Sequence, residues 1–343
     1  MKQTNVGVIG VGSMGYNHVR IYSELENTNL MAISDMMRGT LDKVSKEFNT
    51  IGYVDYDNIL KLDDIEIVNI CVPTVYHYNV VMDAIEAGKN VLVEKPIALE
   101  ISEAQKMIDA AKDAGVTLAT GHVERFNPAV RVAKQLIDDG EIGEIVTANS
   151  KRLGPFPPRI RDVGVAIDLA IHDIDIFNYI FESHPTTVFA NMSSKLANCE
   201  FEDHAEIMTK YDNGALSILE TNWLTPYKKR QLNITGVDGI ISVDYGNQTV
   251  TLYKENNQVK NVKVKNKEPL KEELKSFVNA VNTKTEPEVS GLDGFKALKI
   301  VKAAMKSSKE QLYLPSLRNI AKKDVPTAPI IQSSSKTAFG KII

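Results

Sequence analysis

Three short motifs in this sequence carry the side-chain types that redox chemistry at a hydroxyl group requires. Gly10-Val11-Gly12-Ser13-Met14-Gly15 follows an apolar run and opens a helical pattern. Glu94-Lys95-Pro96 ends a later apolar run, and Asp168 and His172 lie four residues apart in a helical segment. The first motif is typical of dinucleotide binding. The other two would place an ammonium, a carboxylate and an imidazole beside the dinucleotide, an arrangement suited to oxidising a hydroxyl to a carbonyl with a nicotinamide cofactor.

Each glycine of the first motif has its own physical reason. Gly10 permits a tight turn, Gly12 lets the backbone approach a pyrophosphate, and Gly15 lets the helix pack closely on the strand. The first turn of the helix, with Ser13 and Met14, would face the phosphate charge. A glycine-rich structural turn is the alternative. The strand pattern before the motif and the helical pattern after it favour the dinucleotide site.

The acidic residue that such a site needs stands at the end of the second predicted strand. Asp35 would accept hydrogen bonds from the adenosine ribose and repel a 2′-phosphate, which favours NAD over NADP. The nearby Arg38 leaves that choice open, because an arginine can accommodate the phosphate. Pro73 and Thr74 fall where the ribose would cross the sheet, and His77 could line the same cleft.

The position of Lys95 distinguishes it from an ordinary surface lysine. It directly follows a buried parallel strand, at the sheet edge where folds of this kind bind ligands. Pro96 stiffens the backbone there and would hold the lysine in one direction. We therefore expect Lys95, together with the preceding Glu94, to lie beside the cofactor.

Asp168 and His172 are expected on one face of a helix that covers about residues 165–181. Apolar residues flank both side chains, so the segment has the composition of a buried helix. A helix-stabilising Asp–His pair is the alternative to a catalytic role. Asp175, three residues past His172, could orient the imidazole or face solvent.

The elements that must position these residues form an α/β pattern in two parts. The first ~120 residues alternate strand and helix patterns, which predicts a Rossmann domain with a doubly wound parallel sheet. The second part predicts an α+β domain on an open, mostly antiparallel sheet, with turn signals such as Asp212-Asn213-Gly214. We expect an NAD-binding domain at 1–121, a substrate domain at 122–314 and a polar tail at 315–343. The predicted strands of the first part cover residues 6–9, 30–34, 68–72, 91–93 and 117–120.

Composition excludes several other classes of function. The formal net charge of −4 argues against a general nucleic-acid or anionic-membrane binder. No apolar run approaches the ~18 residues of a membrane span, and the first residues lead directly into a strand pattern, so we expect a cytoplasmic protein without a signal peptide. Only two cysteines occur, and Cys71 lies in an apolar strand, so neither a disulfide framework nor a metal site is expected.

The three motifs, in this order and at these separations, resemble the glucose-fructose oxidoreductase/inositol dehydrogenase (Gfo/Idh/MocA) family over about residues 1–310. By that resemblance Lys95, Asp168 and His172 carry over as the catalytic trio. His172 would be the general base on a substrate hydroxyl, Lys95 would stabilise alkoxide charge, and Asp168 would help hold the substrate. Lys95 is the rival base, because burial can lower the pKa of a lysine.

The substrate is indicated by cations around the predicted cleft. An acidic protein that concentrates positive charge near its active site is expected to bind an anion, although chance positive charge in solvated loops is the alternative. The stretches GHVERFNPAV, RLGPFPPRIRDVGVAIDLAIHDID and NWLTPYKKRQL resemble the nucleotide-sugar branch of the family. That resemblance implies NAD-dependent oxidation of the 3-hydroxyl of a UDP-sugar, UDP-N-acetylglucosamine, with its uronic acid as a close alternative. Besides the catalytic trio, the expected substrate contacts are His122, Arg125, Arg152, Arg159, Arg161 and Arg230.

Two further readings stay open at this point. A dehydrogenase of inositol or of another free sugar would not need the cationic loops. An NAD-binding regulator on the same fold would not need the trio. The open sheet of the second part is expected to find a partner, which favours a homo-oligomer.

Overall fold

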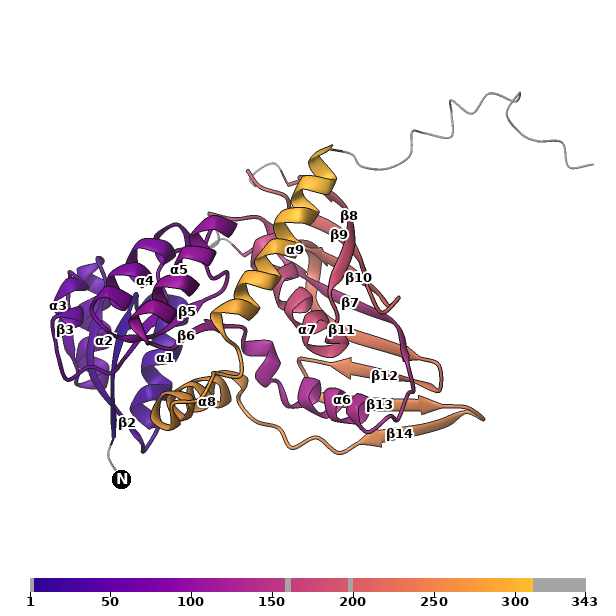
Figure 1. The fold of residues 1–343 in the computed structure, drawn as a ribbon, viewed down its shortest axis with the longest axis horizontal. Coiled ribbons are helices and arrows are strands. Elements are labelled where there is room, and N and C mark those ends of the chain that lie inside the picture. The colour runs from indigo at the N-terminus through magenta and orange to yellow at the C-terminus, as the bar shows by residue number, and fades with distance from the viewer. Residues whose placement is uncertain (1–2, 158–161, 197–199, 311–343) are drawn as a thin grey trace, which may run out of the picture.

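The computed structural model describes residues 3–157, 162–196 and 200–310. Within them the chain forms two sheets with different topologies, and long helices lie between the sheets (Figure 1). No helix in this described part is long and apolar enough to cross a membrane.

The first sheet is parallel, with the strand order β3-β2-β1-β4-β5-β6. This order reverses direction at β1, and such a switch point is where doubly wound folds bind ligands. The prediction of a Rossmann sheet is therefore confirmed. Its strands are β1 (Thr4–Ile9), β2 (Thr28–Ser34), β3 (Ile51–Tyr53), β4 (Ile67–Ile70), β5 (Asn90–Glu94) and β6 (Leu118–Gly121). Its helices are α1 (Ser13–Glu24), α2 (Arg38–Phe48), α3 (Asp57–Leu60), α4 (His77–Glu86) and α5 (Ile101–Ala114), with a short 3-10 turn η1 (Thr74–Tyr76) before α4.

The second sheet is mostly antiparallel, with the order β14-β13-β12-β11-β7-β10-β9-β8 and one parallel pair, β7 with β10. Alternate residues of its strands are buried against helices, as in β9, where inward-facing residues are buried and the residues between them are exposed. Its strands are β7 (Ile145–Pro155), β8 (Pro185–Ser193), β9 (His204–Tyr211), β10 (Leu216–Asn222), β11 (Leu224–Gly236), β12 (Gly239–Asp244), β13 (Thr249–Lys254) and β14 (Gln258–Val262). The other elements of this part are η2 (Val123–Phe126), α6 (Pro128–Asp138), η3 (Ala166–Ala170), α7 (Ile171–Phe181), α8 (Pro269–Thr283) and α9 (Gly291–Glu310).

The last two helices join the two parts of the molecule. Leu274 and Phe277 of α8 belong to the same buried cluster as Val8 and Val19 of the first sheet and its first helix. Helix α9 packs against both α5 and β8 (Figure 1). Part of the expected substrate domain, 122–314, thus completes the core of the dinucleotide domain.

Local details differ from the sequence predictions in two places. Strand β3 was not predicted, because it is three residues long and largely exposed. The helix predicted over 165–181 begins with a π-helical turn, η3, whose hydrogen bonds span five residues.

Candidate active site

The glycine loop between β1 and α1 has the shape that a dinucleotide requires. Gly10 has a φ of 83°, and a Cβ on Gly15 would lie 1.8 Å from the Gly10 carbonyl oxygen. Neither position therefore tolerates a larger side chain. A Cβ on Gly12 would meet nothing within 4 Å, so this residue faces open space at the start of α1. The loop fits a pyrophosphate at the N-terminus of α1.

Asp35 is attached to this loop. One carboxylate oxygen accepts a hydrogen bond of 2.9 Å from the backbone of Val11, and the other accepts one of 2.8 Å from Met37. Each oxygen keeps a lone pair for a ribose hydroxyl. Arg38, the exposed first residue of α2, lies close by in the sequence. Sequence reasoning missed the exposed apolar side chains that border this edge, where an adenine would gain contact area: Met36, Met37, Val75 and Tyr76.

Pro73 and Thr74 lie at the carboxyl end of β4, as expected, but His77 has another role. Its Nδ1 lies 2.7 Å from the Pro96 carbonyl oxygen and its Nε2 lies 3.0 Å from the Val72 carbonyl oxygen. The ring is 1% exposed. His77 therefore fastens the backbone after β5 to the backbone after β4, and its ring nitrogens are occupied within the protein.

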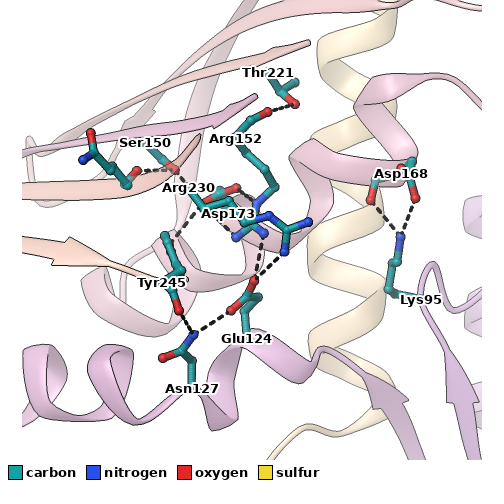
Figure 2. A network of polar contacts seen from close by, with 11 residues as sticks. Lys95, Glu124, Asn127, Ser150, Arg152, Asp168, Asp173, Thr221, Arg230 and Tyr245 are labelled. Atoms are coloured by element: carbon teal, nitrogen blue, oxygen red, sulfur yellow. Dashed lines mark hydrogen bonds and ion pairs between the residues drawn. The ribbon is translucent and has the colours of Figure 1, made fainter. Parts of the chain in front are cut away.

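Lys95 reaches from the end of β5 to the second part of the chain. Its Nζ donates hydrogen bonds to the carboxylate Oδ1 of Asp168, at 3.0 Å, and to the backbone oxygen of the same residue, at 2.7 Å (Figure 2). Two motifs that are 73 residues apart in sequence thus meet at the carboxyl edge of the first sheet.

His172 is the second residue of α7 and lies one turn after Asp168. Its Nδ1 is buried and has no hydrogen-bond partner among the described residues. Burial and the nearby positive charges of Lys95 and Arg152 lower the pKa of His172 well below its usual value. The imidazole is therefore neutral near neutral pH and can accept a proton. Asp168 is engaged with Lys95, so the alternative of a helix-stabilising Asp–His pair finds no support in this geometry.

His122 follows β6 and is 1% exposed. Neither ring nitrogen has a partner among the residues that the structure describes. Burial is the main cause of the lowered pKa of His122, and Lys95 contributes to it. Its two nitrogens are therefore buried donors or acceptors without a described partner, within reach of the charge of Lys95.

Arg152, predicted as a substrate ligand, lies in a buried ion-pair network of the second sheet (Figure 2). Its guanidinium is 2.8 Å from Glu124 Oε1 and is also paired with Asp173, which additionally accepts a hydrogen bond of 3.0 Å from the Tyr245 hydroxyl. The arginine side chain is 2% exposed. This placement does not support direct contact between Arg152 and an anionic substrate. Nothing in the sequence patterns had indicated Asp173 as its partner.

Arg125, also predicted as a substrate ligand, is paired in the same way. Its Nε and one terminal nitrogen contact both carboxylate oxygens of Asp175, at 2.7 and 2.6 Å, and Asp293 adds a third contact at 3.1 Å. Both expectations for Asp175 were wrong, since it neither orients His172 nor faces solvent but holds this buried arginine. Arg125 joins η2, α7 and α9.

Among the expected substrate arginines that the structure describes, Arg230 on β11 remains open to a ligand. It lies 3.7 Å from Glu124 Oε1, and 40% of its side chain is exposed. Burial, followed by the charge of Arg152, lowers its pKa. It belongs to a pocket of about 660 Å³ lined by Tyr227, Lys228, Lys229, Arg230, Gln231, Asp244, Gly246 and Asn247. Arg159 and Arg161 lie outside the described residues. In the described part, no group of three or more His, Cys, Asp or Glu residues could hold a metal ion.

This combination of a switch-point glycine loop, a ribose acid and a lysine–aspartate–histidine cluster defines an NAD-binding oxidoreductase with a second, sheet-based domain. Comparison with protein families agrees. Residues 4–122 match the oxidoreductase family with an NAD-binding Rossmann fold, and residues 130–242 match the GFO/IDH/MocA C-terminal domain. The chain belongs to the GFO/IDH/MocA family.

Similar proteins differ in their substrates. An uncharacterised oxidoreductase of Bacillus subtilis is 30% identical over 89% of this chain and 94% of its own length. Myo-inositol 2-dehydrogenase of Thermotoga maritima is 27% identical over 89% of this chain and 96% of its own. UDP-N-acetylglucosamine 3-dehydrogenase of Acidithiobacillus ferrooxidans is 29% identical over 74% of this chain and 78% of its own. A solved structure of the last enzyme superposes with a TM-score of 0.83, at 27% identity, over 91% of this chain and all of that one.

Proposed function

We propose that the protein oxidises the 3-hydroxyl of UDP-N-acetylglucosamine to a ketone, with NAD as the oxidant. The observation that carries the proposal is the contact of Lys95 with Asp168 at the cofactor edge, beside the neutral His172. The similarity to UDP-N-acetylglucosamine 3-dehydrogenase in sequence and in fold supports this choice of substrate.

The three side chains have different roles at the reacting hydroxyl. The imidazole of His172 takes the hydroxyl proton, because burial keeps it neutral and Nδ1 has no competing partner. Lys95 donates two hydrogen bonds to Asp168, and its Nζ would stabilise the developing alkoxide. The hydride would pass from the carbon to NAD, held by the glycine loop and Asp35.

The cations of β11 would bind the diphosphate. Arg230 shares a pocket with Lys228, Lys229 and the exposed ring of Tyr227. A guanidinium and two ammonium groups suit phosphate oxygens, and an exposed aromatic ring can stack on a base. With Arg125 and Arg152 already paired to carboxylates, Arg230 is the arginine that we assign to this role.

A free cyclitol is the second candidate, favoured by one observation. The myo-inositol 2-dehydrogenase of Thermotoga maritima matches over a larger share of both chains than the UDP-sugar enzyme does. The uronic acid of UDP-N-acetylglucosamine is a variant of the first candidate, and a regulator that binds NAD without turnover is a third reading.

A panel of substrates with NAD, followed by the absorbance of NADH, separates these candidates. We expect turnover of UDP-N-acetylglucosamine in preference to its uronic acid, free N-acetylglucosamine and myo-inositol.

Arg230→Gln should raise the KM for the UDP-sugar by roughly ten- to a hundredfold, the loss of one charge-assisted contact. Lys151→Gln is the matched control, since that lysine is paired with Glu220 on the sheet surface. Faster turnover of myo-inositol, unaffected by Arg230→Gln, would contradict the proposal.

We also propose that a second copy of the chain covers the outer face of the second sheet. Met208 and Ile218 are paired in register on β9 and β10 and are 42% and 40% exposed, and Val146 of β7 is also exposed. Exposed apolar side chains on adjacent strands favour an interface. Sedimentation of the protein and of a Met208→Lys, Ile218→Lys variant tests this, and a monomer for the unmodified protein would contradict it.

A further inference from the structure

A buried row of polar side chains connects the dinucleotide-binding helix to Glu94, next to Lys95. The Tyr22 hydroxyl donates to Asn69 Oδ1 at 2.8 Å, and Asn69 Nδ2 lies 2.5 Å from His18 Nδ1. His18 Nε2 lies 3.0 Å from Glu94 Oε1. His18 and Asn69 are 0% exposed and Tyr22 is 1% exposed, so water does not compete for these bonds. None of the roles described above uses this row.

The hydrogen bonds of the row run in a single direction. The Tyr22 hydroxyl donates to the oxygen of the Asn69 amide, and the amide nitrogen of Asn69 faces His18. An amide nitrogen only donates, so His18 Nδ1 accepts and the ring proton sits on Nε2. The Nε2 proton is then donated to Glu94. Each member of the row fixes the orientation of the next, and the row ends on the carboxylate.

The carboxylate of Glu94 in turn holds the backbone of Lys95. Its Oε2 accepts a hydrogen bond of 3.2 Å from the Lys95 amide. On the neighbouring strand, a Cβ at Gly121 would lie 3.2 Å from the carboxylate, so the carboxylate is confined from that side. Glu94 is 8% exposed, and its two oxygens accept from His18 and from Lys95.

We propose that His18 is a positioning residue for Lys95, acting through Glu94, and that it links the helix at the pyrophosphate site to the catalytic lysine. His18 and Tyr22 lie on α1, which begins at Ser13, directly after the glycine loop. Lys95 directly follows β5. The row thus fixes the position of α1, which begins at the pyrophosphate site, relative to Lys95. The inference rests on the proposed function in that Lys95 must contact the reacting hydroxyl.

The charge on Glu94 depends on this row. Burial raises the pKa of Glu94, but the hydrogen bond from His18 and the nearby charges outweigh burial and lower it overall. Without His18 the carboxylate would lose its main compensation and take up a proton at a higher pH. The titratable groups that act on Glu94 from the elements around it are His18, Cys71, His77, Lys95 and Glu273.

Kinetics of matched variants test the proposal. His18→Phe removes the donor to Glu94 and should lower kcat by roughly ten- to a hundredfold with little change in the KM for the substrate. Tyr22→Phe removes only the hydroxyl that orients Asn69 and should lower kcat in the same direction by less. Tyr16→Phe removes a hydroxyl of the same helix that contacts Glu47 outside the row, and should leave kcat unchanged. His18→Gln, whose amide can donate to Glu94, should recover part of the loss.

Two readouts separate positioning from a general effect on folding. In His18→Phe the acid limb of the pH profile of kcat should move to higher pH. In the double variant His18→Phe, Glu94→Gln that movement should be absent, because position 94 no longer titrates. Nitrogen-15 spectra of labelled histidine in the cofactor-free protein should show His18 protonated on Nε2 alone, assigned by its loss in His18→Phe. A normal kcat in both His18→Phe and Tyr22→Phe, or a proton on Nδ1, would overturn the proposal. Lys95→Met distinguishes a failure of the His18 proposal from a failure of the proposed function. Full activity in that variant would refute the proposed function itself.

Discussion

Replacing His172 by alanine is expected to remove the chemical step while leaving the cofactor site intact. The Nδ1 of His172 has no hydrogen-bond partner among the described residues, the glycine loop included. Loss of a general base lowers kcat by about 10²–10⁴-fold, and the dissociation constant of NAD should stay unchanged. His184→Ala is the matched control, since His184 is exposed and lies past the end of α7, whereas His172 lies at its start.

The same variant should change how stability depends on pH. Burial, followed by the charges of Lys95 and Arg152, lowers the pKa of His172 in the folded state, while the unfolded chain keeps a value near 6.5. As the pH falls below about 6.5, the unfolded state gains a proton that the folded state does not, so the folded state loses stability. One such group contributes a slope of about 1.4 kcal/mol per pH unit until the folded pKa is reached.

Urea denaturation at pH 7.5 and at pH 5.5 would measure that slope. The free energy of unfolding of His172→Ala should fall less on acidification than that of the unmodified protein, by up to about 1.4 kcal/mol for each pH unit below about 6.5. Burial also lowers the pKa values of His122 and His77. These two residues contribute equally to the pH dependence of the unfolding free energy in both proteins. An unchanged slope together with near-normal kcat would show that His172 is neither buried as a neutral ring nor the base, and the base role would pass to Lys95.

Three further outcomes are expected. Asp35→Ala should weaken NAD binding and reduce the preference for NAD over NADP, because the ribose contact and the repulsion of a 2′-phosphate vanish together. Titration with both cofactors measures this, and an unchanged ratio of the two dissociation constants would show that Asp35 does not bind the ribose. Lys95→Met should lower kcat far more than it weakens NAD binding, as stopped-flow and equilibrium titration would show; equal losses in both would contradict it. Arg152→Leu should destabilise the fold by about 3–5 kcal/mol in urea denaturation, since Asp173 and Glu124 lose their partner; a loss under about 1 kcal/mol would contradict that.

The architecture of the first part could be predicted because its signals are local. Apolar runs that end in Gly10, Asp35 and Lys95 identify both the strands and the sheet edge at which they stop. The sharing of α8 between the two parts could not be predicted, since its apolar face fits either core. Strand β3 is too short and exposed to give a pattern.

For the site, residue types were predictable and pairings were not. Motif spacing placed Lys95, Asp168 and His172 together, but nothing in the sequence shows that η3 turns Asp168 onto the lysine. Cation counting assigned Arg125 and Arg152 to a substrate because the sequence does not reveal which carboxylates face them across the fold. Charge composition records how many charges there are, and burial decides which of them remain available to a ligand.

The transfer of one labelled hydrogen tests the central claim most directly. UDP-N-acetylglucosamine that carries deuterium at C3 would be incubated with the protein and NAD, and the reduced cofactor analysed by mass spectrometry. The account predicts singly deuterated NADH from the unmodified protein and none above background from Lys95→Met. Reduced cofactor without deuterium, or no reduction by this sugar where myo-inositol reduces NAD readily, would contradict it.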